Sequence, residues 1–245
     1  MIMSENKNSR LAFLLPFRCI VFVLIFLIGA AVTGKKTEEL SNWWSIAATV
    51  VNIVTVLMLF AAARHLGGYR KLMNLYRGDS SQKKIFLQAL IYSGIGMSGM
   101  YLAGFVCYGS MLPAVTVEYV ITPVPAAVAV INLILLPLTV SFAEDGLYLG
   151  CGVNSFKNKY AAVIIPAFFY ALQHCFIPTI FDVKYMLYRF LSFLPLTVIF
   201  CIFYRRKKDP LAIMISHAVL DLGTSVMILL TSVSPELYQK WYDMV

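Results

Sequence analysis

The chain has 245 residues, 60% of them hydrophobic and 13% charged, and its mean hydropathy is +0.78. Soluble domains are roughly 45–50% apolar and about 25% charged, so the composition excludes an ordinary soluble domain and predicts an integral membrane protein. The formal net charge of +8 does not indicate nucleic-acid binding, because the basic residues lie between apolar runs, where they set membrane orientation.

Seven apolar segments follow one another along the chain. In lipid they must be helices, because an open strand would leave backbone groups unpaired. We therefore predict an all-α polytopic membrane protein with about seven transmembrane helices, forming a single transmembrane domain over residues 1–245. The first run is longer than the apolar part of a signal peptide, so we expect it to be an uncleaved helix. The segments are about 11–32, 44–63, 85–112, 124–150, 159–180, 185–204 and 211–231.

The basic residues predict how these helices are oriented. Most of the 20 Lys and Arg residues fall in the N-terminal tail, where we include Arg18, and in the segments 64–84, 151–159 and 205–208. Arg189 is among the few assigned to the opposite side. By the positive-inside rule, the N-terminus is expected in the cytoplasm and the C-terminus outside. His65 falls in a basic loop and receives no catalytic role.

Few ionisable side chains remain within the spans. An acid at the centre of a span costs about 2.5–3.5 kcal/mol, so such residues need mutual pairing, a wet cavity or a metal. The five cysteines are scattered and no pair has CxxC spacing, so neither a disulfide framework nor a zinc knuckle is indicated. The intramembrane groups are Glu144, Asp145, His174, His217 and Asp221.

Their spacing places these groups on three separate helices. In "HAVLD", His217 and Asp221 are four residues apart and lie on one helical face. In "YALQH", Tyr170 precedes His174 by the same interval. Each piece alone also fits a structural hydrogen bond between helices, a tether or an anchor at a span end. Together they predict that polar groups from three helices converge on one site.

This pattern resembles the CPBP (Abi) family of intramembrane proteases, which includes CAAX-prenyl endopeptidases and bacterial proteins linked to bacteriocin processing or immunity. The family shows the motifs EExxxR, FxxxH and HxxxN or HxxxD on successive helices. The resemblance covers a protease-like core of about residues 124–231 and implies a bacterial plasma membrane protein. The matching residues are Glu144 and Asp145 in the first motif, Tyr170 and His174 in the second, and His217 and Asp221 in the third.

The chain departs from the family pattern at three motif positions. Asp145 stands where the family has a second Glu, Tyr170 stands for Phe, and Leu149 stands for Arg. The missing arginine would pair with an acid, so its loss leaves two readings of the site. The chain is either an active protease with an altered site or a non-catalytic relative that binds a peptide.

The resemblance implies peptide hydrolysis inside a polar cavity, acting on a small peptide or a membrane-associated protein tail. Glu144 would be the general base on a water molecule, with Asp145 as a supporting carboxylate. His174, His217 and Asp221 would hold a metal, tentatively zinc, or the histidines would stabilise the oxyanion. The partners are then a peptide or protein substrate and the lipid bilayer, and no nucleic acid.

One other class of function and one geometric condition remain open. Intramembrane acids also relay protons, so a proton-coupled transporter is a third interpretation, although the chain shows no inverted repeat. In a simple up-and-down layout, His174 lies late in its span and nearer the outer face than Glu144 and His217. The site therefore requires tilt, a late start or a break near Pro166 in that span.

Overall fold

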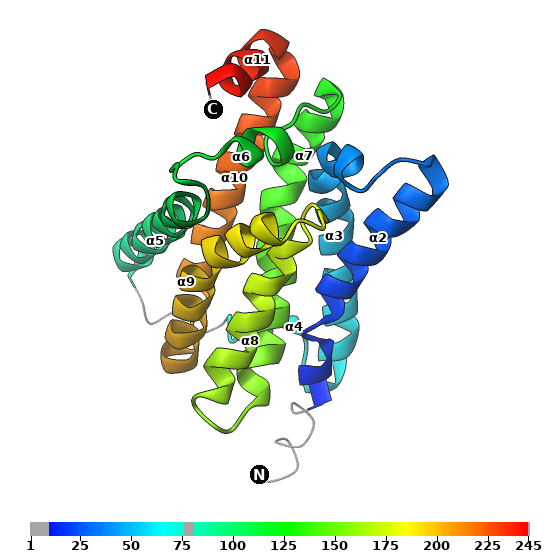
Figure 1. Cartoon of the computed structure of the whole chain (residues 1–245). Coiled ribbons are helices and arrows are strands. Elements are labelled where there is room, and N and C mark those ends of the chain that lie inside the picture. Colours follow the sequence, from blue (N-terminus) through cyan, green and yellow to red (C-terminus); the bar gives the residue numbers. More distant parts are fainter. Residues whose placement is uncertain (1–9, 76–80, 245) are drawn as a thin grey trace.

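Helices form nearly all the regular structure in the computed structural model, which describes residues 10–75 and 81–244 (Figure 1). Within those ranges there is no β-strand, so the predicted all-α class is confirmed. The first half contains η1 (Arg10–Leu14), α2 (Phe17–Thr33), η2 (Glu38–Trp43), α3 (Trp44–Ala63), η3 (Arg64–Leu66), α4 (Tyr69–Leu72), α5 (Gln82–Tyr108) and α6 (Ala114–Tyr119). The second half contains α7 (Ala126–Val140), η4 (Ser141–Val153), α8 (Ala161–Leu172), η5 (Gln173–Cys175), α9 (Val183–Lys207), α10 (Leu211–Val233) and α11 (Pro235–Met244).

Six helical stretches of the described residues are long and apolar enough to cross a membrane. They correspond to six of the seven predicted segments, some extended by the short helices that adjoin them. The exception is the predicted segment 159–180, where the apolar helix covers only Ala161–Cys175. At about 1.5 Å per residue, such a helix is too short to cross the hydrocarbon core of about 30 Å.

The chain turns from α8 into α9 about midway along the bundle (Figure 1). The returning helix α9 ends near the level at which α8 begins, so α8 and α9 together form a hairpin. The start of α2 and the C-terminal helix α11 consequently lie at opposite ends of the bundle, as the seven-segment layout requires. Which end faces the cytoplasm stays a prediction.

Glycines end two of the long helices. α2 is followed by Gly34 at φ 69° and α5 by Gly109 at φ 73°, and each glycine N–H donates to a carbonyl of the helix before it. This left-handed backbone conformation is tolerated best by glycine. The turns at these two places are therefore encoded locally.

The surface of the bundle carries large apolar side chains on several helices. In a soluble protein such extensive exposure would be a liability, whereas in a bilayer it faces lipid. The integral membrane assignment therefore agrees with the structure. Examples at least half exposed are Leu57 on α3, Leu102 on α5, Ile131 on α7 and Val219 on α10.

The interior of the bundle is organised around η4, a π-helical continuation of α7. Pro137 in α7 has no N–H for the preceding turn, and the wider helix begins shortly afterwards at Ser141. Gly146 lets α3 and α4 approach, since a Cβ there would lie 2.8 Å from the hydroxyl of Tyr69. That hydroxyl donates to the carbonyl of Phe142 at 2.7 Å. The helix that carries the two predicted acids is thus held by close backbone packing.

Candidate active site

The two acids are adjacent residues near the start of η4 and are both buried. Glu144 is 2% exposed and Asp145 is 0% exposed. A buried carboxylate is stable only if charges or donors compensate its lost hydration. The contacts of the two side chains therefore show how each negative charge is compensated.

The predicted convergence of three helices is observed. The Oε2 atom of Glu144 lies 3.8 Å from Nε2 of His174 and 3.6 Å from Nε2 of His217. These separations exceed an ordinary hydrogen bond, but a water beside the carboxylate can reach both Glu144 and an imidazole at about 2.9 Å. The residues come from η4, η5 and α10, which are distant in the sequence.

His174 reaches this level because α8 is short. The helix ends at Leu172, and His174 lies in the single turn η5 that follows it inside the bundle. Arg189 of α9 donates to the carbonyls of His174 at 3.3 Å and Ile177 at 2.9 Å, which satisfies backbone acceptors at this buried helix end. Arg189, which the positive-inside pattern assigned to the outer side, is instead a buried support of the site.

The imidazole of His174 is also fixed by an aromatic ring. Phe193 of α9 stacks on it, with ring centroids 3.5 Å apart and planes within 5°. The guanidinium carbon of Arg189 lies 5.1 Å from the centroid of the same Phe193 ring. His174 therefore has a defined orientation toward Glu144.

Asp145 contacts His217 both directly, with Oδ1 3.5 Å from Nδ1 of the imidazole, and through a tyrosine. The Tyr170 hydroxyl donates to Oδ1 of Asp145 at 2.8 Å and lies 2.9 Å from Nδ1 of His217. Because that hydroxyl proton goes to Asp145, its oxygen is free to accept from the imidazole N–H. Oδ2 of Asp145 is buried and has no hydrogen-bond partner among the described residues.

Asp221 adds a second carboxylate beside His217. Its Oδ2 lies 3.4 Å from Nε2 of His217, one helical turn before it on α10, as the sequence spacing predicted. The Asp221 side chain is 22% exposed, more than either acid of η4. His217 is thus bounded by Asp221 on one nitrogen and by the Tyr170–Asp145 pair on the other.

Two contributors to the site were missed from the sequence. Arg18 of α2 donates through Nη2 to Oε1 of Glu144 at 2.7 Å, and Gln173 donates through Nε2 to Oε2 of Glu144 at 2.7 Å. The assignment of Arg18 to the cytoplasmic tail was wrong, because its side chain is 0% exposed inside the bundle. Its position within the apolar run 11–32 was the available signal. Gln173 was missed because only ionisable residues were considered.

A cavity of about 810 Å³ lies against one side of this cluster. Tyr170, His174, His217 and Asp221 line it, while Glu144 and Asp145 lie behind them. The rest of its wall is largely apolar and comes from α5, α6, α9, α10 and α11. Representative apolar residues are Met97, Val117, Phe193, Leu220 and Trp241. The cluster thus meets a space large enough for an extended apolar ligand.

Zinc was predicted on His174, His217 and Asp221. Within residues 10–75 and 81–244, no group of three or more His, Cys, Asp or Glu side chains is arranged to hold a metal ion. Both oxygens of the adjacent Glu144 already accept hydrogen bonds from protein donors. The side chains as arranged therefore do not fit a zinc site, and zinc remains a prediction.

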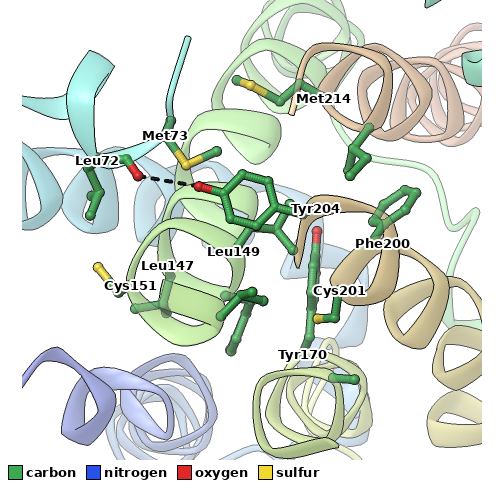
Figure 2. Close-up of a cluster of buried hydrophobic side chains, with 14 of the residues drawn as sticks. Leu72, Met73, Leu147, Leu149, Cys151, Tyr170, Phe200, Cys201, Tyr204 and Met214 are labelled. Carbon is green, nitrogen blue, oxygen red and sulfur yellow. Dashed lines mark hydrogen bonds between the residues drawn. The ribbon is translucent and has the colours of Figure 1, made fainter. Parts of the chain in front are cut away.

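Leu149 occupies the motif position at which the family has arginine. It is 0% exposed and belongs to a buried apolar cluster with Leu72, Met73 and Tyr204 (Figure 2). The Tyr204 hydroxyl, which closes one side of this cluster, donates to the carbonyl of Leu72 at 3.4 Å. A leucine side chain suits these surroundings, and the cation beside Glu144 comes from α2 instead.

Comparison with known proteins supports the relationship suggested by the motifs. Residues 126–223 match the family model described as Type II CAAX prenyl endopeptidase Rce1-like. No curated protein and no solved structure matches the chain. The matched residues include η4, α8, η5 and most of α10, and they exclude α2.

Proposed function

Since residues 126–223 belong to the CAAX protease (CPBP) family, as the motifs predicted, we propose that the chain is an intramembrane endopeptidase with Glu144 as its general base. The observation that carries the proposal is the meeting of Glu144, His174 and His217 beside an apolar cavity. A buried carboxylate next to imidazoles at a cavity wall is a typical arrangement for acid–base chemistry. The family match supports the reaction class, and the geometry supports the proposed roles.

The reaction requires a water molecule between Glu144 and the scissile carbonyl. Glu144 accepts a proton from this water through Oε2, and the water oxygen bonds to the carbonyl carbon. The carbonyl oxygen becomes an oxyanion, which the N–H groups of His174 and of protonated His217 stabilise. Glu144 then returns the proton to the amide nitrogen, and the C–N bond breaks to give an acid and an amine.

The remaining groups orient His217 for this task. In its protonated form the imidazole has two donors, one at each nitrogen. The Nδ1–H is directed to the Tyr170 hydroxyl, which Asp145 holds in place. The Nε2–H faces the cavity near Glu144 and Asp221. His217 can therefore donate to an oxyanion without losing its anchor.

The substrate proposed is the end of a membrane-associated peptide or protein, of the lipid-modified CAAX type that the family description names. The cavity supports this choice, because its wall is mostly apolar and its ionisable lining includes His174, His217 and Asp221. An apolar tail can occupy the greater part of the space while the peptide bond lies against the histidines. Burial in this cavity also keeps bulk water away from the reacting groups.

The test is cleavage of a quenched fluorescent peptide that ends in a farnesylated cysteine followed by three residues, in proteoliposomes. Glu144→Gln keeps the shape of the side chain and removes the base, so we expect kcat to fall about 10²–10⁴-fold. Glu236→Gln removes an exposed carboxylate on α11 and serves as the matched control. Peptides recovered from membranes carrying each variant extend the test to natural substrates.

Three results would contradict the proposal. They are failure of the wild type to cut either the probe or any membrane peptide, undiminished cleavage by Glu144→Gln, and uptake of solute driven by a proton gradient. The first of these, with peptide still bound, would favour the non-catalytic binding protein. Metal content measured on the same preparations tests the zinc prediction separately, and stoichiometric zinc lost together with activity on chelation would support it.

A further inference from the structure

Arg18 lies outside the family-matched segment and yet forms an ion pair with the proposed general base. It is carried by α2, and its fully buried guanidinium makes three side-chain hydrogen bonds. Nη2 donates to Oε1 of Glu144 at 2.7 Å, Nε to Oε1 of Gln173 at 2.5 Å and Nη1 to Oγ1 of Thr55 at 3.3 Å. Three different elements, η4, η5 and α3, are thus joined through one side chain of α2.

These bonds form a closed ring with Glu144. Arg18 donates to both Glu144 and Gln173, and Gln173 donates in turn to Oε2 of Glu144 at 2.7 Å. A planar guanidinium presents several N–H groups in fixed directions, which a lysine ammonium cannot reproduce. The ring fixes the carboxylate by both oxygens and directs Oε2 toward the histidines.

The charge of Arg18 also takes the place of the arginine that the family motif has at position 149. The first motif of the family includes an arginine, but position 149 is a leucine enclosed in an apolar cluster. A buried carboxylate without a cation beside it would be costly. In this chain the positive charge beside Glu144 comes from Arg18 on α2 and not from η4.

We propose that Arg18 is the positioning residue for Glu144, so that α2 completes an active site whose other groups lie within the family-matched segment. The inference rests on the proposed function, because it assigns Arg18 a role through the general base. It also implies that the functional unit extends beyond the core of about 124–231. Arg18 touches no substrate, and its effect is exerted on the orientation and charge of Glu144.

The first test compares two changes at Arg18 with a matched control. Arg18→Met removes the charge and all three hydrogen bonds, and Arg18→Lys keeps the charge but cannot join Glu144 to Gln173. Arg64→Met removes an exposed arginine at the end of α3 and controls for loss of one positive charge. Activity is measured on the farnesylated peptide with folded protein isolated by size-exclusion chromatography.

We expect a change in kcat with little change in KM. Arg18→Met is expected to lower kcat about 10²-fold, which is the scale of effect produced by a misplaced catalytic group. Arg18→Lys is expected to be more stable than Arg18→Met, because it keeps the charge, but to keep kcat at least about tenfold low, while Arg64→Met behaves as wild type. A purely structural tether would instead let Arg18→Lys restore stability and kcat together.

The second test needs no substrate. Thermal unfolding midpoints in detergent are measured for Arg18→Met, Glu144→Gln and the double variant. Each single change leaves one buried polar partner uncompensated, whereas the double change removes both charges. The double variant is therefore expected to unfold at a higher temperature than Arg18→Met alone. Simple additivity of the two shifts would overturn the pairing.

Failure of this inference is distinguishable from failure of the proposed function. If Glu144→Gln abolishes cleavage while both Arg18 variants cleave with wild-type kcat, the role of Arg18 is overturned and the protease assignment stands. If Glu144→Gln cleaves normally, the protease mechanism fails, and with it the role of Arg18 in catalysis. If Arg18→Met does not fold, the kcat of Arg18→Lys decides the question.

Discussion

The start of η4 and the part that follows one to two turns later have different surroundings, polar at the start and apolar further along. At its start, Glu144 and Asp145 contact charged and polar side chains of four other elements. Further along, Leu147, Leu149 and Cys151 pack in a buried cluster of apolar residues (Figure 2). The apolar part anchors the helix, and the polar part is thereby held at a fixed position in the bundle.

A second difference separates the two adjacent acids. Glu144 accepts hydrogen bonds at both oxygens and faces two imidazoles, whereas Asp145 accepts one bond, from Tyr170. Under the proposed function, Glu144 acts at the cavity, whereas Asp145 holds Tyr170 and His217. The two neighbouring carboxylates have different surroundings because different helices cover them.

The largest effect is expected when the apolar part of η4 receives a charge. Leu149→Arg restores the residue type of the family motif but buries a cation among apolar side chains. We expect a loss of about 3–5 kcal/mol in the free energy of unfolding, the scale of an unpaired buried charge. Thermal unfolding in detergent measures it, with Leu149→Met as the volume-conserving control. A stable Leu149→Arg variant that rescues Arg18→Met would show that the two positions are equivalent.

Removing the charge of Asp145 is expected to have a smaller effect than removing that of Glu144. Asp145→Asn keeps the size of the side chain but weakens its hold on Tyr170, so we expect kcat to fall about 10–100-fold, as for other groups that orient a catalytic histidine. The measurement is cleavage of the farnesylated peptide beside Glu144→Gln, with Asp243→Asn on exposed α11 as the control. Equal losses for the two acids would contradict the division of tasks.

The link between Asp145 and Tyr170 predicts a non-additive pair. Tyr170→Phe removes the bridging hydroxyl and is expected to lower kcat about tenfold. Asp145→Glu alone crowds that hydroxyl, because both side chains are buried. In the double variant, the longer acid can use the vacated space to approach His217. In the wild type, Nδ1 of His217 lies 3.5 Å from Oδ1 of Asp145. The double variant should therefore be more active than Tyr170→Phe.

A double-mutant cycle and one control variant test whether Asp145→Glu compensates for Tyr170→Phe. A double-mutant cycle on kcat gives the coupling between positions 145 and 170, and Tyr160→Phe controls for loss of an exposed phenol. A double variant less active than the product of the single effects would show that the bridge through the hydroxyl is not what orients His217.

The smallest effect is expected at Asp221. This carboxylate is partly exposed at the cavity, and its contact with His217 is long at 3.4 Å. Asp221→Asn is expected to lower kcat about 2- to 10-fold, which corresponds to about 0.5–1.5 kcal/mol for one hydrogen bond. Steady-state cleavage checks this value. A loss as large as that of Glu144→Gln, together with loss of bound zinc, would instead favour Asp221 as a metal ligand.

Much of the fold followed from local properties of the sequence. Apolar run length predicted six of the long helices, because a span must satisfy its backbone internally and cover the hydrocarbon core. The run 159–180 was misleading in one respect, since its apolar character continues past the end of α8. The turn there is stabilised by Arg189 from α9, a contact made in three dimensions.

The candidate site was predictable to the extent that its residues are short-range neighbours or rare in spans. The interval of four residues brought His217 beside Asp221, and the scarcity of intramembrane charges singled out Glu144 and His174. The partners Arg18 and Gln173 were not predicted. Arg18 resembled an orientation signal near the N-terminus, and nothing local indicates which helix it faces.

The sequence by itself determined that this protein spans a membrane with helices and that a few polar groups are confined within them. Hydropathy and the interval of four residues are local quantities, so a linear reading is sufficient for both. Only the tertiary structure decided the depth of His174, the enclosure of Leu149 and the pairing of Arg18 with Glu144. These depend on where helices end and which faces pack together, and that is set by contacts among residues far apart in the chain.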